Sequence, residues 1–307
     1  MKLVRTILIT LLLLFLLKWG VVSSYYIPYA GMENALYEGD RVLVKKYAYG
    51  IQVPFVNTLG HQQLLERPAE YGDIVVFKNP NPQYHKSNII ERASYIGRCV
   101  GVPGDTLVLD REQRFSTVLH RDLALAHPYF YPASLDDSLQ QVMKAAHIQA
   151  NKLVGYKEDQ YIRCFSNQEI AKIQPQFSSI LQPAPLPKDT SAIYTSLIIP
   201  QKGEVITMTP QNVSFYAKVI LQHEQEAALV KDSVLYINGI QRTSYTFKQN
   251  YYWMLSNNAI NLHDSRHFGF VPQNHLIGKA FLIWLSKDTT SSLWEGYRWN
   301  RFFQIVQ

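Results

Sequence analysis

An apolar segment at the N-terminus constrains this chain more than any other feature. Lys2 and Arg5 precede a run from Thr6 to Tyr25 in which Lys18 is the only charged residue. As a helix, such a run is about 30 Å long, which matches the hydrocarbon core of a bilayer. A basic flank stays on the cytoplasmic side of the inner membrane. We therefore expect residues 1–5 in the cytoplasm, a transmembrane anchor over 6–25, and the rest of the chain on the periplasmic side.

A cleaved signal peptide is the alternative interpretation of this segment. Its apolar region would be long for a signal peptide, and no Ala-x-Ala cleavage site follows it. The nearest substitute, Val22-x-Ser24, is a poor one. We therefore favour an uncleaved single-pass anchor that contacts membrane lipid.

The composition restricts the class of the remaining chain. The chain has 307 residues, of which 47% are hydrophobic and 18% charged, with a net charge of +6. This surplus suits an anionic surface, but no zinc knuckle, basic repeat or phosphate loop indicates nucleic-acid binding. Two cysteines are too few for a disulfide scaffold. We expect Cys99 to be a buried thiol in a strand, and whether it pairs with Cys164 stays open.

Short β-branched runs dominate both ends of the chain and predict a mainly β fold. Two of them follow a Gly-Asp pair, at 39–40 and 72–73. Further strands are expected over 95–101, 106–109, 234–237 and 278–285, with a tight hairpin at Asn238-Gly239. These strands predict a β core made of residues 26–109 and 234–307.

The middle of the chain, residues 110–233, has a different pattern and is expected to be an inserted mixed α/β subdomain. Helical spacing of apolar residues predicts helices over 136–152, 166–173 and 209–227. Residues 174–190 are rich in Pro, Ser and Gln, which indicates a linker or loop. The aromatic stretch 47–55 fits an interfacial belt and ordinary core packing equally well.

Five sequence boxes occur in an order that resembles bacterial type I signal peptidases with large insertions. They are Ile-Pro-x-x-x-Met-x-x-x-Leu-x-x-Gly-Asp from residue 27, Gly-Asp-Ile-Val-Val-Phe from 72, Arg-x-Val-Gly-x-Pro-Gly-Asp from 98, Asp-Ser-Arg-x-x-Gly-x-Val-Pro from 264, and Gly-Lys-Ala from 278. The resemblance covers residues 1–109 and about 234–307. It implies antiparallel β-sheets on the outer face of the membrane, an apolar surface on the lipid, and a groove that takes signal peptides as an added strand.

The resemblance also implies peptide hydrolysis by a Ser/Lys dyad, but neither residue is present. The position of the nucleophilic serine, between Pro28 and Met32, holds Gly31. The position of the basic lysine, directly before Arg98, holds Gly97. A serine hydroxyl needs a nearby base, and glycine supplies neither hydroxyl nor amine.

Two supporting positions of the family pattern differ as well. The serine that donates to the oxyanion is replaced by Tyr29, which we expect to crowd the cleft and fill part of it. The serine that orients the lysine is replaced by Leu262. Residues with a groove-lining or structural role in the family remain, and they are Pro28, Met32, Asp40, Arg98, Asp264 and Arg266.

Other residues offer little replacement chemistry. His263, Asp264 and Ser265 have the residue types of a triad, but neighbours on a strand point to opposite faces. Ser256 replaces a glycine of the family, and with His263 or His267 as base it is the main candidate for a rescued hydrolase. The histidines have no metal-ligand spacing, and we expect neither metal nor cofactor.

We therefore interpret the chain as a signal-peptidase-like pseudoenzyme that acts as a binding or scaffold subunit in protein export. The expected partners are an active signal peptidase, a secretion or outer-membrane assembly, or signal peptides, and not nucleic acid. The alternative is a signal peptidase that keeps its activity through other residues.

Overall fold

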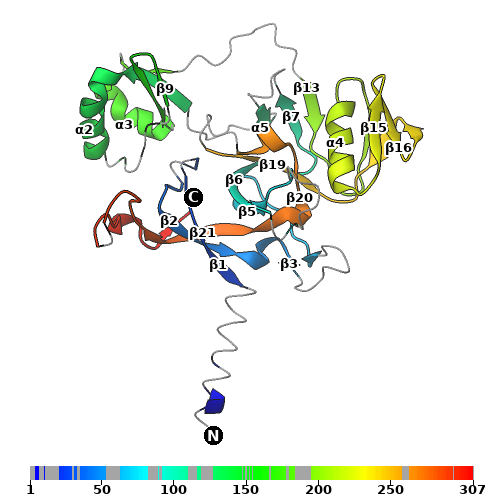
Figure 1. Cartoon of the computed structure of the whole chain (residues 1–307), viewed down its shortest axis with the longest axis horizontal. Coiled ribbons are helices and arrows are strands. Elements are labelled where there is room, and N and C mark those ends of the chain that lie inside the picture. Colours follow the sequence, from blue (N-terminus) through cyan, green and yellow to red (C-terminus); the bar gives the residue numbers. More distant parts are fainter. Residues whose placement is uncertain are drawn as a thin grey trace.

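The computed structural model describes residues 4–6, 10, 21–29, 31–32, 35–52, 63–81, 89, 92–109, 116–118, 127–146, 148, 151, 153, 155–165, 167–177, 180–183, 195–257, 263–292 and 294–306. In this part of the chain the largest sheet has the order β1-β2-β21-β5-β6-β19-β20, and β22 also pairs with β21 (Figure 1). The strands are β1 (Val22–Tyr26), β2 (Asp40–Lys45), β5 (Ile74–Lys78), β6 (Ser94–Gly101), β19 (Tyr251–Leu255), β20 (Val271–Pro272), β21 (Leu276–Ser286) and β22 (Gln304–Ile305).

Every strand pair in this sheet is antiparallel, which confirms the mainly β prediction. Successive side chains of a strand point to opposite faces, so β5 contributes to two apolar clusters. Ile74 and Val76 pack on one face with Met32 and Leu36. Val75 and Phe77 pack on the other face with Tyr49, Cys99, Met254 and Phe268. The central sheet is therefore buried on both sides.

The two Gly-Asp pairs form the tight turns that lead into β2 and β5. Gly39 and Gly72 both have φ of +89°, a conformation that L side chains rarely adopt. At Gly39 a Cβ atom would also lie 1.8 Å from the Lys287 carbonyl oxygen, so only glycine allows this close approach. The following Asp40 is fully buried, and its Oδ2 accepts a 2.7 Å bond from Arg301 Nη2. This ion pair fixes the C-terminal segment to the start of β2.

A second layer extends from the sheet and has its own helix (Figure 1). Its apolar core joins Leu107, Leu197, Ile220 and Leu235 to Trp253 of β19. Asn238 and Gly239 have φ of +52° and +80°, which confirms the predicted tight hairpin. The elements of this layer are β7 (Thr106–Leu109), β8 (Ser116–Val118), β13 (Thr195–Ile198), β14 (Val205–Thr207), α4 (Val213–His223), β15 (Ala228–Lys231), β16 (Val234–Ile237), β17 (Ile240–Arg242) and β18 (Ser244–Thr246).

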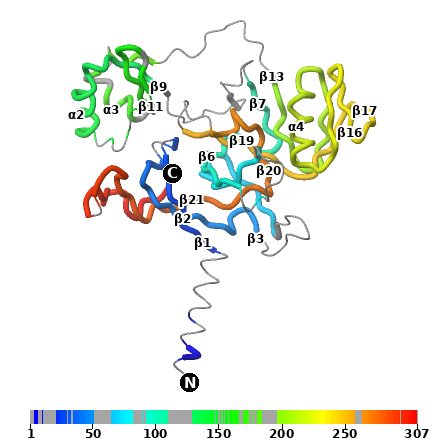
Figure 2. The backbone as a smooth tube through the Cα atoms, in the orientation of Figure 1, coloured from blue at the N-terminus to red at the C-terminus, as the bar shows by residue number. Residues whose placement is uncertain are grey.

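Residues 127–183 form a separate subdomain, visible at the upper left of Figure 2. Its apolar cluster, which includes Tyr131, Leu139, Phe165 and Ile173, is drawn entirely from this range. Its elements are β9 (His127–Pro132), η4 (Ala133–Leu135), α2 (Asp136–Ala145), β10 (Gly155–Lys157), β11 (Gln160–Phe165), α3 (Asn167–Phe177) and β12 (Gln182–Pro183). Within the predicted insertion at 110–233, residues from Thr195 onward instead share the core of β7 and β19.

The remaining short elements are η1 (Lys46–Tyr49), β3 (Ile51–Gln52), β4 (Gln63–Leu64), α5 (Ser265–Phe268), η5 (Gln273–His275) and η6 (Trp299–Arg301). In the stretch 47–55, Tyr49 is buried in the core, which agrees with core packing at this residue, whereas Tyr47 is 44% exposed. The interfacial belt stays a prediction. Residues 53–55 lie outside the described residues.

The three predicted helices exist as α2, α3 and α4, with shifted ends. The predicted linker 174–190 starts too early, because α3 continues to Phe177 and β12 follows at Gln182. The helix predicted over 6–25 is wrong at its C-terminal end. Val22 to Tyr25 belong to β1, because β-branched and aromatic residues there pair in register with β2, Val22 opposite Lys45. Among the described residues, no helix is long and apolar enough to cross a membrane.

Candidate functional site

The loop between β1 and β2 positions Pro28, Tyr29, Gly31 and Met32. Two backbone bonds close it at its base, from Ile27 N to Asp40 O and from Gly39 N to Ile27 O, both 2.9 Å. Met32 is 2% exposed and fixes the loop to the core, and its carbonyl accepts a 2.7 Å bond from Leu36 N. Gly31 is buried beside it. The described residues of the loop therefore have a packed backbone, and its sequence from 27 to 39 contains no Ser, Thr or Cys.

Tyr29 does not fill the cleft, so that expectation is wrong. Its side chain is 78% exposed and projects from the loop into solvent. The next described residues, Gly31 and Met32, are buried, and Met32 packs in one apolar cluster with Leu36. The phenol is therefore available to solvent or to a partner.

Gly97 lies in the middle of β6, opposite Val75 of β5. A Cβ atom at this position would lie 3.3 Å from the Leu255 carbonyl oxygen, 3.4 Å from Phe77 Cε1 and 3.5 Å from Met254 Cβ. The direction in which a side chain would leave residue 97 is thus lined by an aromatic ring, an aliphatic carbon and one carbonyl. None of these groups can accept a proton from a serine hydroxyl.

The edge of β6 beside Gly97 is open among the described strands. β5 pairs with residues 94–98 of β6 along one edge. On the other edge β19 pairs only with Arg98, Cys99 and Gly101. No described strand pairs with Ser94 to Gly97 on that side. This half of β6 therefore offers backbone donors and acceptors next to Gly97, the predicted position of the family's lysine.

Asp264 and Arg266 form a buried ion pair behind β19. Arg266 Nη2 lies 2.6 Å from Asp264 Oδ2, and the two side chains are 6% and 1% exposed. Asp264 also accepts bonds from the backbone nitrogen of Ser256 at 2.9 Å and from that of Arg266 at 3.0 Å. A carboxylate with this many donors connects the 263–268 turn to the end of β19.

Arg98 serves a similar structural purpose on the other side of β19. Its Nε donates to Asn257 Oδ1 at 3.1 Å, and its Nη1 donates to the Gly72 carbonyl at 3.1 Å. Burial lowers the pKa of Arg98, although an arginine stays protonated at neutral pH. The side chain joins the turn before β5 to the residue after β19.

Ser256, the main candidate for a replacement nucleophile, is part of the ion-pair cluster. Its hydroxyl donates to Asp264 Oδ2 at 2.8 Å and accepts from Arg266 Nη2 at 3.1 Å, and the residue is 3% exposed. His263 stacks on Tyr95, with ring centroids 5.9 Å apart. Sequence reasoning missed Ser256 and Asn257 as partners of Asp264 and Arg98, although both directly follow β19.

Three further predictions concern residues around this site. Cys99 and Cys164 are both buried thiols that form no disulfide with each other, which confirms the expected buried thiol at Cys99. Leu262, the position of the lysine-orienting serine, lies outside the described residues. Among the described residues, no group of three or more His, Cys, Asp or Glu side chains could hold a metal ion.

Comparison with known proteins agrees with the five boxes. The family model "Signal peptidase, peptidase S26" matches residues 1–151 and 198–285, together more than half of the chain. The chain is 26% identical over 306 residues to the signal peptidase I of Buchnera aphidicola subsp. Schizaphis graminum, covering 96% of the chain and 78% of that relative.

Two further relatives have lower identity over a similar span. The signal peptidase I of Haemophilus influenzae is 23% identical, with 97% of the chain and 73% of the relative covered. The signal peptidase I of Pseudomonas aeruginosa is 23% identical, with 90% of the chain and 69% of that relative covered. The family model leaves out 152–197, which includes β11 and α3 of the separate subdomain. The chain therefore belongs to the signal peptidase family, peptidase S26.

Proposed function

We propose that this chain is a signal-peptidase family member that binds a peptide or protein partner without hydrolysing it. The observation that carries the proposal is the pair Gly31 and Gly97 at the two dyad positions of the family pattern. At residue 97 even a new side chain would leave the backbone toward Phe77 and Met254. A hydrolase of this type needs an oxygen nucleophile and a base in hydrogen-bond reach of it.

The open edge of β6 supports peptide binding in the absence of cleavage. An extended peptide can add to a sheet edge through main-chain hydrogen bonds alone, and these bonds need no catalytic side chain. Ser94 to Gly97 offer such an edge among the described residues. The exposed ring of Tyr29 belongs to the loop at 27–32 and offers one further contact surface for a partner.

A cleavage assay tests the inactive state directly. The full-length chain in liposomes is incubated with a preprotein, beside a signal peptidase I of known activity as positive control. We expect no mature product from this chain and complete processing by the control. Product formation that disappears in Ser256→Ala would establish the alternative, an active signal peptidase that uses other residues. The related proteins of Buchnera aphidicola and Haemophilus influenzae are named signal peptidase I, which is the reason to test this alternative.

Restoring the dyad tests how far the site has changed. We expect Gly31→Ser with Gly97→Lys to remain inactive, because a Cβ at residue 97 comes within 3.4 Å of Phe77 and within 3.3 Å of a backbone oxygen. A contact this close requires the neighbour to shift. Gly97→Ala is the matched control for folding. Efficient processing by the double variant would mean that only the two reactive groups have been lost.

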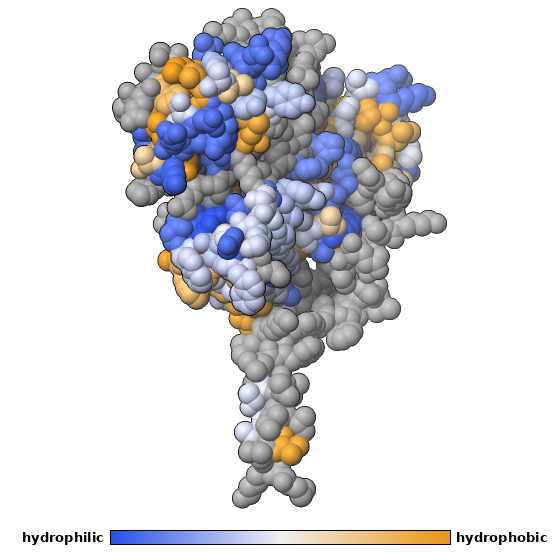
Figure 3. Space-filling view, turned by 60° about the vertical axis from the view of Figure 1, so that its left-hand side comes forward, coloured by the Kyte–Doolittle hydropathy of each residue, from blue (hydrophilic) through white to orange (hydrophobic). Residues whose placement is uncertain are grey.

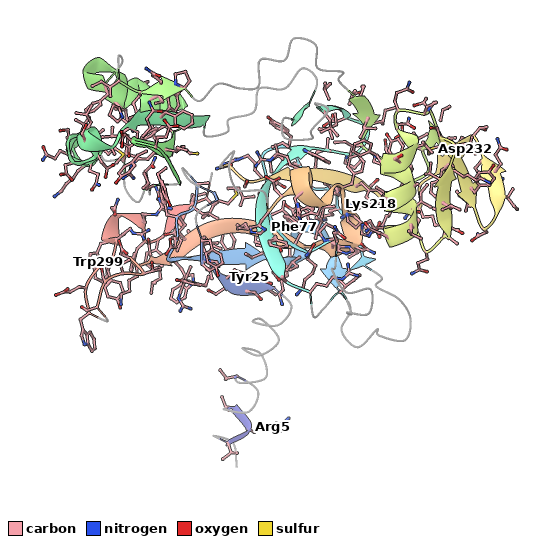
Figure 4. All side chains as sticks on the ribbon, turned by 45° about the horizontal axis from the view of Figure 1, so that its top comes forward. Arg5, Tyr25, Phe77, Lys218, Asp232 and Trp299 are labelled. Atoms are coloured by element: carbon pink, nitrogen blue, oxygen red, sulfur yellow. The ribbon has the colours of Figure 1, made fainter. Side chains whose placement is uncertain are left out.

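We also propose that the N-terminal segment anchors the chain in the inner membrane, with its folded part on the periplasmic side. Exposed aromatic and aliphatic side chains suit a lipid interface, and they are Tyr26 at the end of β1, Trp294, Trp299 and Phe303 in the segment after β21, and Ile305 in β22. Trp299 lies at the outer edge of the molecule in Figure 4, and Figure 3 shows hydrophobic residues low on the body. Protease accessibility in spheroplasts tests the orientation. Protection of the folded part would contradict it.

The proposed partner is a component of protein export, namely an active signal peptidase, a secretion or outer-membrane assembly, or a signal peptide. Affinity purification of the tagged chain from its native membranes in mild detergent, followed by mass spectrometry, tests this proposal. We expect a stoichiometric export protein, whereas a chain that purifies alone would argue against a stable subunit and favour transient peptide binding.

A further inference from the structure

A pocket lies between α4 and the segment that joins β19 to β20. Its floor is apolar and aromatic, and it contains Phe215 from α4, Trp253 from β19 and Phe270 from the joining segment. Trp253 and Phe270 are buried and meet edge to face, with ring centroids 5.5 Å apart. The cavity volume is about 180 Å³. Pockets for whole small-molecule ligands hold roughly 300–1,000 Å³, so this one suits a single large side chain.

The rim of this pocket is cationic. Lys218 and His267 are both exposed, and they line it from opposite elements, α4 and α5. No Asp or Glu occurs among the described lining residues, and neither Lys218 nor His267 forms an ion pair with a described carboxylate. Figure 4 labels Lys218 on α4. An apolar pocket with a lysine at its mouth and no described carboxylate in its lining favours a hydrophobic group that carries a negative charge.

His223 adds a neutral polar group at the end of the same helix face. Burial, together with the nearby Arg92 and Lys218, lowers the pKa of His223 to about 3. At neutral pH its ring is therefore uncharged, and the fixed positive charge of the pocket comes from Lys218. The ring also packs against His275, with centroids 5.4 Å apart, which holds it in place.

We propose that this pocket binds the C-terminal residue of a polypeptide whose last side chain is large and apolar, with its carboxylate between Lys218 and His267. The volume admits one such side chain, and a carboxylate adjacent to a single side chain is what a chain terminus presents. Because Lys218 and His267 at the mouth are exposed, the preceding residues can remain in solvent. This site is independent of Gly31 and Gly97, so it does not depend on the absence of hydrolysis.

Fluorescence anisotropy with a synthetic probe tests the proposal on the full-length chain in detergent micelles. The probe is fluoresceinyl-Gly-Ser-Gly-Ser-Gly-Phe with a free carboxylate. The two comparison peptides are its C-terminal amide and a version that ends in Gly. We expect the amide and the Gly-ended peptide each to bind about tenfold or more weakly, because each loses one of the two recognition elements. Equal binding of all three peptides would overturn the proposal.

Variants of the protein assign the binding to this pocket. Lys218→Gln should weaken the free-acid peptide about five- to tenfold and leave the amide unchanged. Phe215→Ala should weaken both. Lys231→Gln removes an exposed lysine of β15 outside the pocket and is the matched control. A Lys218→Gln variant that binds the free acid like the Lys231→Gln control would refute the assignment, provided that both variants melt at the same temperature.

Free N-acetyl-phenylalanine separates a chain terminus from a small acid. We expect it to bind more weakly than the hexapeptide, because the residues that precede the terminus add contacts at the pocket mouth. Equal affinity of the two compounds would show that the pocket recognises a small hydrophobic acid, and it would overturn the assignment of a polypeptide terminus.

Discussion

Asp264 provides a direct test of whether the buried Asp264–Arg266 ion pair stabilises the fold. The change is Asp264→Asn, which keeps the size of the side chain and removes its charge. Arg266 would then carry a positive charge on a side chain that is only 6% exposed and has lost its carboxylate 2.6 Å away. Breaking a buried ion pair at one partner costs about 3–5 kcal/mol, because the other charge stays buried and uncompensated. We expect a loss of this size in the free energy of unfolding.

Urea unfolding of the full-length chain in detergent micelles, followed by tryptophan fluorescence, measures this loss. We expect the m-value, the dependence of the unfolding free energy on urea concentration, to stay unchanged. The matched control is Lys202→Gln, because Lys202 pairs with Glu66 at 3.7 Å and both side chains are largely exposed, 61% and 45%. Exposed ion pairs contribute about 0–1 kcal/mol. The double variant Asp264→Asn/Arg266→Gln should lose less than the sum of its single changes, because neither charge remains. A loss below about 1 kcal/mol for Asp264→Asn would refute the reasoning.

Three further predictions follow from packing and charge. Gly278→Ala should destabilise the fold by about 3 kcal/mol or more in urea unfolding, because its Cβ would lie 2.3 Å from the backbone oxygen of Lys45. Gly97→Ala, whose Cβ would lie 3.3 Å from its nearest atom, should cost about 1 kcal/mol. Equal losses for the two variants would contradict this reasoning. Burial acts to raise the pKa of Asp136, but bonds from Tyr131, Arg163 and Gln140 outweigh it and lower the pKa. Its stabilising contribution is therefore complete above the ordinary aspartate pKa of about 4 and disappears as the pH falls through the lower folded value. Thermal melts against pH should show this acid-side loss in the wild-type chain and a flatter profile in Asp136→Asn; identical profiles would be evidence against it. Cys99 and Cys164, which are 0% and 1% exposed, should resist a thiol reagent until the chain unfolds, and rapid modification of both under native conditions would contradict their burial.

The positions of the main strands could be predicted from local sequence. β-branched runs bounded by Gly-Asp turns gave β2 and β5, and Asn238-Gly239 gave the hairpin of β16 and β17. Such signals are local, since the turn residues need φ values that glycine and asparagine tolerate. The end of the apolar N-terminal run was misjudged because hydrophobicity alone does not separate a helix from a paired strand. β1 is a strand because β2 lies beside it.

The candidate site was only partly visible in the sequence. The family pattern assigned Asp264 and Arg266 a groove-lining or structural role, and in the structure they form a buried ion pair at 2.6 Å. The outward direction of Tyr29 and the use of Ser256 as a partner of Asp264 were not expected. Both depend on which side of a loop or strand end faces the core, which local propensity does not specify.

The sequence by itself determined the residue types at the two positions that match the dyad of the family pattern. Gly31 and Gly97 have no side chain in any fold, so the loss of hydroxyl and amine at these positions needs no coordinates. Only the tertiary structure decided what surrounds them. Among the described strands, the partial pairing of β6 with β19 leaves the edge beside Gly97 open. The pocket beside α4 is lined by residues of this helix and by residues 267–270. Such features join segments that are distant along the chain, and they arise from strand register and side-chain packing, not from local sequence pattern.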